Sequence, residues 1–257
     1  MRILLTNDDG ISYPGIRLLA AELCGEHEVC IVTPASQRSG ASHSVTFIDP
    51  LFLELTDPPL EGFTGHAYGL SGTPVECLWL ALDELFPQPD LVIAGINNGH
   101  NLGNDIFLSG TVNVAIAAAL RGVPAISSSL CAHNSKDYLP AVKVTAKLVE
   151  YVKTHPIPPR TVWNLNVPNI PLAEMKGVAF PPLDKNGYRY SYVTGKSPIG
   201  MDYYWPDCRY YDPWPFEGAP KTDREFIEAG YVTLTPITVD LTDHAGLEKI
   251  KEEPFQL

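Results

Sequence analysis

The chain opens with a short apolar run that stops abruptly in acidic residues. Residues 3–5 (Ile-Leu-Leu) are followed after one residue by Asn7-Asp8-Asp9-Gly10. Such a run is typical of a parallel strand that is buried on both faces. In an open α/β sheet, ligands bind at the carboxyl ends of the strands, which is where Asp8 and Asp9 would lie. The feature therefore favours an α/β fold with a ligand site directly after the first strand.

Two adjacent carboxylates at such a position repel each other. About 5 Å apart at an effective dielectric constant of about 20, the repulsion is roughly 3 kcal/mol. A divalent cation would offset it, and oxygen ligands suit a hard cation. From these residues alone, a solvated Asn-Asp-Asp-Gly turn and a cation site both remain open.

Apolar runs and amphipathic segments alternate along the next 160 residues. This alternation predicts a doubly wound, mostly parallel sheet, with strand–helix–strand units of right-handed crossover. An edge hairpin or two edge strands are expected at Val45–Phe47 and Leu51–Leu55. The expected strands are 3–5, 28–33, 91–94, 124–130, 161–167 and 231–239, and the expected helices are 14–23, from Thr73, from Ser109, 137–152, 222–229 and 247–252.

Composition excludes some classes of function. The 257 residues carry a formal net charge of −12 and no run of Lys or Arg, so the surface repels the phosphate backbone of nucleic acids. The N-terminus does not resemble a signal peptide, and no apolar stretch approaches membrane-spanning length. The five cysteines are scattered and are interpreted as reduced thiols. A cytoplasmic protein without a nucleic-acid or membrane partner is the expectation.

Three further polar segments fall where parallel strands end or a helix begins. Residues 36–44 are rich in small hydroxyl residues, and Ser39 could give an oxygen to a hard cation. Residues 95–104 contain three glycines and four asparagines, of which Asn97 could donate a neutral oxygen. Ser109-Gly110-Thr111 opens a helix and offers hydroxyl and N–H groups to an anion. A flexible loop, an ordinary Asn-Gly loop and a simple helix cap are the competing interpretations.

The last third of the chain has a different character. From about Lys176, tyrosines and tryptophans crowd a segment rich in Pro, Gly and Asp, most densely between Tyr188 and Trp214. Hairpin arms are expected there, and exposed aromatics at this density indicate a subunit interface or a wall over the site. Asp240 and His244, which follow the last strand, could act as a distant general acid or form a structural hinge pair, and the sequence favours the structural role.

Taken together, these segments resemble the SurE (survival protein E) family of metal-dependent nucleotide phosphatases. The match rests on several motifs in the same order along most of the chain. Ala94 and Glu76 depart from the family's usual Ser and Asp. The motifs are Asn7-Asp8-Asp9-Gly10, Arg38-Ser39-Gly40-Ala41-Ser42, Gly72-Thr73-Pro74, Gly95-Ile96-Asn97-x-Gly99-x-Asn101-x-Gly103, Ser109-Gly110-Thr111-Val112, Asn164-x-Asn166-Val167-Pro168 and Asp240-x-x-x-His244.

The resemblance implies a site and a fold. One divalent cation per subunit, Mg²⁺ or Mn²⁺, would be held by Asp8, Asp9, Ser39 and Asn97. The fold would be a single SurE-like domain, with a Rossmann-like core at 1–180, a β-hairpin excursion for oligomerisation at 181–230, and a C-terminal strand and helix at 231–257. Within the site, the catalytic residues would be Asp8, Asp9 and Asn97, and the substrate phosphate would be bound by Asn101, Ser109, Gly110 and Thr111.

The family's activity implies the reaction and the assembly. Its members hydrolyse nucleoside 5′- and 3′-monophosphates to nucleoside and inorganic phosphate, and some also trim short-chain polyphosphate. Their C-terminal arms exchange between subunits, so that a homodimer or homotetramer is expected here. Either a metal-bound water or the Asp8 carboxylate would attack phosphorus in line.

Two non-catalytic alternatives share features with this sequence. A receiver-like domain also binds Mg²⁺ through paired acids, but it needs a phospho-accepting Asp after a central strand. The corresponding strand, 91–94, ends in Gly95-Ile96-Asn97, which cannot form an acyl phosphate. A nucleotide-binding or phosphate-binding module without chemistry stays open on the sequence.

Overall fold

The fold is taken from a computed structural model. It describes residues 1–55, 62–132, 135, 137–187, 191–207 and 218–252.

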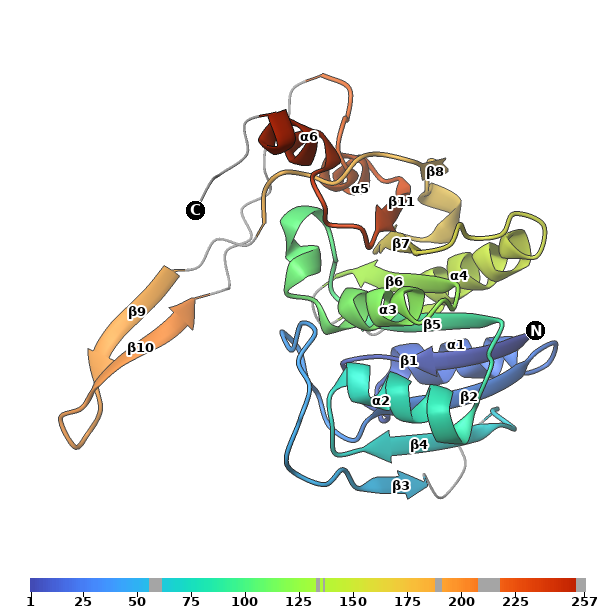
Figure 1. Ribbon diagram of the computed structural model, residues 1–257, viewed down its shortest axis with the longest axis horizontal. Coiled ribbons are helices and arrows are strands. Elements are labelled where there is room, and N and C mark those ends of the chain that lie inside the picture. Colours follow the sequence, from blue (N-terminus) through green and yellow to red (C-terminus); the bar gives the residue numbers. More distant parts are fainter. Residues whose placement is uncertain (56–61, 133–134, 136, 188–190, 208–217, 253–257) are drawn as a thin grey trace.

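A nine-stranded sheet forms the centre of the described part of the molecule (Figure 1), with the strand order β3-β4-β2-β1-β5-β6-β7-β11-β8. The strands from β4 to β7 in this order run parallel, whereas β3 and β11 are antiparallel to their neighbours β4 and β7. The predicted doubly wound α/β fold is confirmed. The strands are β1 (Arg2–Thr6), β2 (Glu28–Pro34), β3 (Leu53–Leu55), β4 (His66–Leu70), β5 (Leu91–Asn98), β6 (Ala125–Cys131), β7 (Thr161–Pro168), β8 (Val178–Ala179) and β11 (Val232–Thr238).

Helices cover both faces of this sheet. Alternate side chains of β1 enter two separate cores: Ile3 and Leu5 pack with α1 and α4, and Leu4 packs with α2 and α3. Buried apolar side chains therefore cover each face of the sheet, as a parallel sheet requires. The helices are α1 (Pro14–Leu23), α2 (Pro74–Leu80), α3 (Gly110–Leu120), α4 (Leu139–Val152), α5 (Asp223–Glu228) and α6 (His244–Glu252).

The order of the strands fixes where a ligand can bind. From the central strand β1 the chain crosses to β2 on one side, while β5 pairs with β1 on the other side. This reversal is a topological switch point, and the crevice outside the carboxyl ends of the two strands is the usual ligand site of such sheets. Residues 7–10 follow β1, and Asn97 lies near the end of β5.

Three local predictions differ from the structure. Val45–Phe47 is not a strand, because its backbone is tied to the start of α2: Thr46 N–H donates to the Glu76 carboxylate, and the Thr73 hydroxyl donates to the carbonyl of Ser44. Strand β4, whose apolar run is diluted by His66 and a glycine, was not expected. Strand β5 extends to Asn98 through a register shift after Ala94, so Asn97 lies within the strand rather than after it.

The predicted hairpin arms lie partly within the described residues. Strands β9 (Ser191–Lys196) and β10 (Asp202–Asp207) pair antiparallel and project from the body of the molecule (Figure 1). Tyr192, Tyr204 and Trp205 are exposed on them. The rest of the expected arms, with Tyr188, Tyr190, Tyr210, Tyr211 and Trp214, lies outside the described residues. The exposed aromatics agree with the predicted subunit interface, which stays a prediction.

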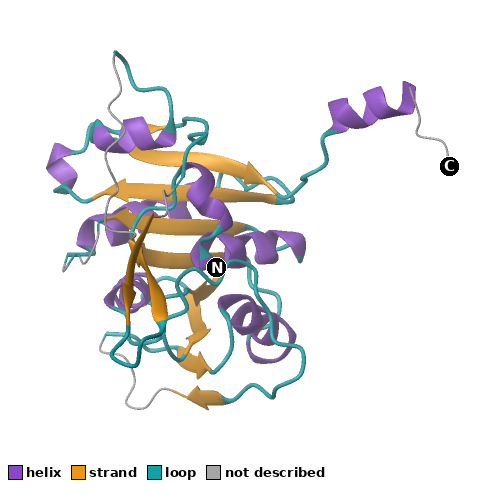
Figure 2. Ribbon diagram, turned by 90° about the vertical axis from the view of Figure 1, so that its left-hand side faces the viewer, coloured by secondary structure: helices purple, strands orange, loops and turns teal. Residues whose placement is uncertain are grey.

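Helix α6 also stands clear of the sheet and its covering helices (Figure 2). It begins at His244, whose Nε2 lies 2.8 Å from Asp240 Oδ2, and both side chains are exposed. Among the described residues, no helix has both the length and the apolarity that a bilayer crossing requires.

The start of α2 yields a stability prediction. Buried Glu76 accepts hydrogen bonds from the N–H groups of Thr73 and Thr46, so that it closes a capping box and anchors residues 44–46 at once. Replacing Glu76 by Ala leaves both N–H groups without this acceptor and should lower the free energy of unfolding by about 1–3 kcal/mol. Urea denaturation measures the loss. Glu84→Ala, at an exposed position, is the control, and an equal loss in both variants would contradict the assignment.

Candidate metal and phosphate site

The turn after β1 is held by its own asparagine. Asn7 is fully buried, its Oδ1 accepts from Gly10 N–H at 3.0 Å, and its Nδ2 donates to the Gly10 carbonyl at 3.1 Å. The loop after β2 closes over the same turn, because Arg38 N–H donates to the carbonyl of Asp8 at 2.7 Å. Asp8 and Asp9 are thereby fixed in a buried turn, with exposed fractions of 3% and 6%. The solvated turn considered from the sequence is excluded.

Asp8 is held by the N-terminus of α3. The Thr111 hydroxyl donates to Asp8 Oδ1, and its oxygen lies 3.3 Å from Asn97 Oδ1. Burial raises the pKa of Asp8, while the Thr111 hydroxyl and the backbone N–H groups of Thr111 and Gly110 oppose the rise. Gly110 permits this contact, since a Cβ there would lie 2.7 Å from the Cβ of Asp8.

Asp9 is the second acid of the pair. Its Oδ2 accepts from Asn98 N–H at 3.1 Å. Burial and, after it, the charge of Asp8 raise the pKa of Asp9 to about 7. Within the described residues, no Lys or Arg forms an ion pair with either carboxylate. The pair is thus costly to ionise in the absence of a cation.

Two neutral oxygens face the same region. Asn97 Nδ2 donates to the Gly99 carbonyl at 2.9 Å, and this bond turns Asn97 Oδ1 toward Thr111 and Asp8. Ser39 is exposed on the loop after β2, and its Oγ accepts from Gln37 Nε2 at 3.1 Å.

One small, open pocket of about 270 Å³ collects most of the predicted residues. Asp8, Ser39, Asn97, Asn101 and Ser109 line it, although they come from four separate segments of the chain. The remaining predicted residues are not among its lining residues. Asp9 accepts a hydrogen bond from Asn98 at the end of β5, and Gly110 and Thr111 contact Asp8.

Asn101 is set by an amide framework at the ends of β6 and β7. Its carbonyl accepts from Asn164 Nδ2 at 2.9 Å and Asn166 Nδ2 at 3.0 Å, and its N–H donates to Asn166 Oδ1 at 2.9 Å. Its own Nδ2 donates to Ser129 Oγ at 2.8 Å. These bonds explain the Asn164-x-Asn166 motif, and they hold Asn101 rigidly at the pocket.

The residues present fit a hard divalent cation. Two nearly buried carboxylates, an amide oxygen and a hydroxyl would provide an oxygen-only donor set of mixed charge, which suits Mg²⁺ or Mn²⁺ better than a soft metal. Burial makes the ionised pair unfavourable by itself, and a cation is what would restore it. Adjacent Ser109, whose hydroxyl caps α3 by accepting from Val112 N–H at 3.1 Å, sits where the positive end of the helix favours an anion.

A different cluster that could bind a metal lies elsewhere. Glu26, His27 and Glu150 offer ligand atoms within 4.8 Å of one another. Glu26 and His27 directly precede β2, and Glu150 is near the C-terminal end of α4. The cluster therefore lies at the opposite edge of the sheet from Asp8, which follows the carboxyl end of β1. Lys153 Nζ already pairs with Glu150 at 2.6 Å, so this cluster has a cation of its own.

Two ionisable pocket residues are not predicted from the sequence. His100 and Asp105 line the pocket beside Asn101. Their position within and just after the glycine- and asparagine-rich segment was the available signal, but an isolated His and Asp in such a segment form no recognisable pattern. Asp240 and His244 are not among the pocket residues, and their mutual ion pair agrees with a structural role.

Comparison with known proteins then decides the family. The model of the family described as survival protein SurE matches residues 3–190, which is most of the chain. The chain belongs to the SurE family. A 5′-nucleotidase SurE from Desulfitobacterium hafniense is 41% identical over 98% of this chain and 96% of its own, and one from Thermosynechococcus vestitus is 37% identical with the same coverage. The crystal structure of the SurE protein from Aquifex aeolicus matches with a TM-score of 0.82 and 34% identity, covering 97% of this chain and 98% of that one.

The contact between Gly110 and Asp8 gives a prediction for this SurE family member. Gly110→Ala adds a methyl group that would lie 2.7 Å from the Cβ of buried Asp8, so either Asp8 or α3 must move. We expect Mn²⁺ affinity, measured by isothermal titration calorimetry, to fall at least about tenfold with a loss of about 1–3 kcal/mol in stability. Gly25→Ala, where no atom lies within 4 Å of the added carbon, is the control. Unchanged Mn²⁺ affinity in Gly110→Ala would refute the role of this contact.

The raised pKa of Asp9 gives a second prediction. Because this pKa is higher in the folded than in the unfolded state, the folded state binds more protons, and metal-free stability should rise as pH falls from about 7 toward about 4. Asp9→Asn removes the charge and keeps an acceptor for Asn98 N–H. Without metal at pH 8, the variant should be more stable than the original protein by about 1–4 kcal/mol.

Added Mn²⁺ should reverse this order, since it stabilises only the protein that retains both carboxylates. Thermal denaturation with EDTA and with Mn²⁺, at pH 5 and pH 8, measures both effects. If metal-free Asp9→Asn is less stable than the original protein at pH 8, then repulsion between Asp8 and Asp9 does not destabilise the metal-free fold.

Proposed function

We propose that this chain is a metal-dependent phosphatase that hydrolyses nucleoside 5′-monophosphates to nucleoside and inorganic phosphate. The observation that carries the proposal is the buried pair Asp8 and Asp9, of which Asp8 lines, with Asn97 and Ser39, a pocket at the N-terminus of α3. The class of reaction, that of a 5′-nucleotidase, is supported by relatives with that name that match along nearly their whole length.

Asp8, Asp9, Ser39 and Asn97 would hold one Mg²⁺ or Mn²⁺. When bound, the cation supplies positive charge to the non-bridging phosphate oxygens and to their developing charge in the transition state. Asn101 and Ser109 would bind the phosphate from the pocket wall, with Gly110 and Thr111 supporting it through the start of α3. Thr111 also fixes the Asp8 carboxylate by its hydrogen bond.

Two attacking groups are compatible with this arrangement. Either water attacks phosphorus in line, or the Asp8 carboxylate does so and forms a phospho-aspartyl intermediate that water then hydrolyses. Rapid acid quenching during turnover of ³²P-labelled AMP distinguishes them. Label retained on the chain and lost in Asp8→Asn supports the second route.

The finer features of the family are part of the same proposal. We expect activity on 3′-nucleotides and on short-chain polyphosphate, a homodimer or homotetramer built with the hairpin arms, and a cytoplasmic location. The division into a core at 1–180, an excursion at 181–230 and a C-terminal strand and helix at 231–257 is likewise proposed. The exposed aromatics of β9 and β10 support the oligomer.

Release of inorganic phosphate from AMP and GMP tests the proposal. We expect turnover with Mn²⁺ or Mg²⁺ that is lost with EDTA. Asp8→Asn keeps the side-chain volume and removes a metal ligand, so it should reduce kcat at least about 100-fold. Circular dichroism and thermal denaturation check that the variant is folded. If neither nucleotides nor a panel of other phosphomonoesters is hydrolysed with any divalent metal, while AMP still binds, the chain is instead a nucleotide-binding module without chemistry.

A further inference from the structure

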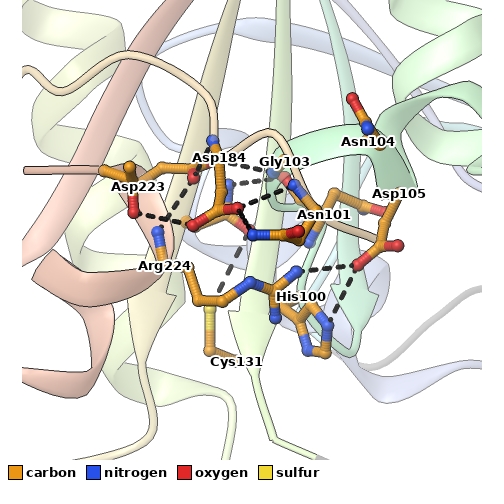
Figure 3. Close-up of polar contacts among 12 residues, drawn as sticks. His100, Asn101, Gly103, Asn104, Asp105, Cys131, Asp184, Asp223 and Arg224 are labelled. Carbon is orange, nitrogen blue, oxygen red and sulfur yellow. Dashed lines mark hydrogen bonds and ion pairs between the residues drawn. The ribbon is translucent and has the colours of Figure 1, made fainter. Parts of the chain in front are cut away.

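A second buried ionic cluster adjoins the pocket (Figure 3). Arg224 Nη2 lies 3.2 Å from Asp105 Oδ2, and His100 Nε2 lies 3.5 Å from the same oxygen. The exposed fractions of the three side chains are 1% for Arg224, 2% for Asp105 and 8% for His100. The Asp105 carboxylate therefore stands between a guanidinium and an imidazole, almost entirely away from water.

The cluster joins two distant parts of the chain. His100 follows β5, Asp105 lies in the 3₁₀ turn Gly103–Phe107, and Arg224 is on α5, 119 positions after Asp105. His100 and Asp105 both line the pocket that also contains Asp8. A contact made by α5 thus extends through Asp105 to the pocket wall.

The backbone of this wall has other restraints. Gly103 N–H donates to Asp223 Oδ2 at 2.8 Å, and Asn104 N–H donates to the carbonyl of Asn186 at 3.0 Å. Asp223 Oδ1 also accepts from Asp184 N–H at 2.8 Å. These bonds fix residues 103–104 without the charges of Arg224 and Asp105. What the ion pair adds is the orientation of the Asp105 carboxylate toward His100.

Stability alone is a poor reason for such a pair. Two ions withdrawn from water lose hydration that their attraction only partly restores, and apolar residues of similar volume often stabilise a fold as well or better. A carboxylate that faces an imidazole, by contrast, restricts the orientation of the ring, as carboxylates do for histidines in many enzyme sites.

We propose that Asp105, balanced by Arg224, is a positioning residue that holds the His100 imidazole in the pocket wall, and that His100 contacts the bound phosphomonoester. This inference rests on the proposed phosphatase function and extends it to three residues outside the predicted metal and phosphate set. In this proposal Arg224 acts through its ion pair with Asp105. The reaction itself gains no additional step, because His100 takes part by contact with the substrate.

A paired substitution separates positioning from stability. Arg224→Met leaves a buried carboxylate without its guanidinium and should lower the Tm strongly. The double variant Arg224→Met/Asp105→Asn removes both charges and should regain most of that Tm. If Asp105 positions His100, kcat for AMP should nevertheless remain about 10- to 100-fold below the original protein in the double variant.

His100→Gln provides an independent variant that leaves the ion pair in place. We expect kcat or kcat/KM to fall about as much as in the double variant Arg224→Met/Asp105→Asn. The Mn²⁺ affinity should stay within about twofold of that of the original protein. Combining His100→Gln with Asp105→Asn should cost little more than either alone, since the two residues act as a unit. Arg121→Met/Asp83→Asn removes an exposed ion pair elsewhere and should leave kcat and KM unchanged.

Two results would overturn the inference while leaving the phosphatase proposal intact. One is recovery of both Tm and kcat in the double variant, which would make the pair purely structural. The other is an unchanged kcat and KM in His100→Gln. If the original protein shows no metal-stimulated turnover at all, the proposed function fails first, and the two failures are therefore distinguishable.

Discussion

The repulsion between two buried carboxylates is the constraint on which the site depends. Asp8 and Asp9 stand at the end of the central strand with almost no access to water, and burial raises the pKa of both. Neutral partners from three segments surround them: Thr111 on α3, Asn98 at the end of β5, and the loop after β2. Hydrogen bonds can orient a carboxylate pair, but only a positive charge removes its repulsion. This repulsion is the physical basis of the proposed cation site.

The fold supplies the partners because of its strand order. The switch point between β1 and β5 brings the turn after β1 beside the end of β5, and α3 then begins at the same edge. Gly110 lets α3 approach close enough for Thr111 to reach Asp8. A further layer of polar side chains, including Asn164 and Asn166, holds the wall that carries Asn101. The pocket is thus built on the rigid edge of a sheet rather than on loops alone.

The sequence was most informative where periodicity and sheet geometry act together. Alternating strands and helices predicted the doubly wound sheet, and the shared edge of parallel strands predicted that Asp8, Asn97 and Ser109 would meet. It was less informative where one side chain decides the backbone. The Glu76 carboxylate accepts a hydrogen bond from Thr46 N–H and so holds residues 44–46 at the start of α2. Val45–Phe47 is therefore not a strand despite its composition. Arg224 lies far along the chain in no recognisable pattern, and only tertiary structure brings it to Asp105.

The central claim is that Asp8 and Asp9 anchor a single divalent cation at this pocket. The most direct measurement is anomalous diffraction from crystals of the protein soaked in Mn²⁺, recorded at the manganese edge. We predict one strong peak per chain at coordinating distance from the side-chain oxygens of Asp8 and Asn97, and no such peak in Asp8→Asn crystals. A strong peak only at another position, such as beside Glu26 and Glu150, or no ordered manganese at all, would contradict the account.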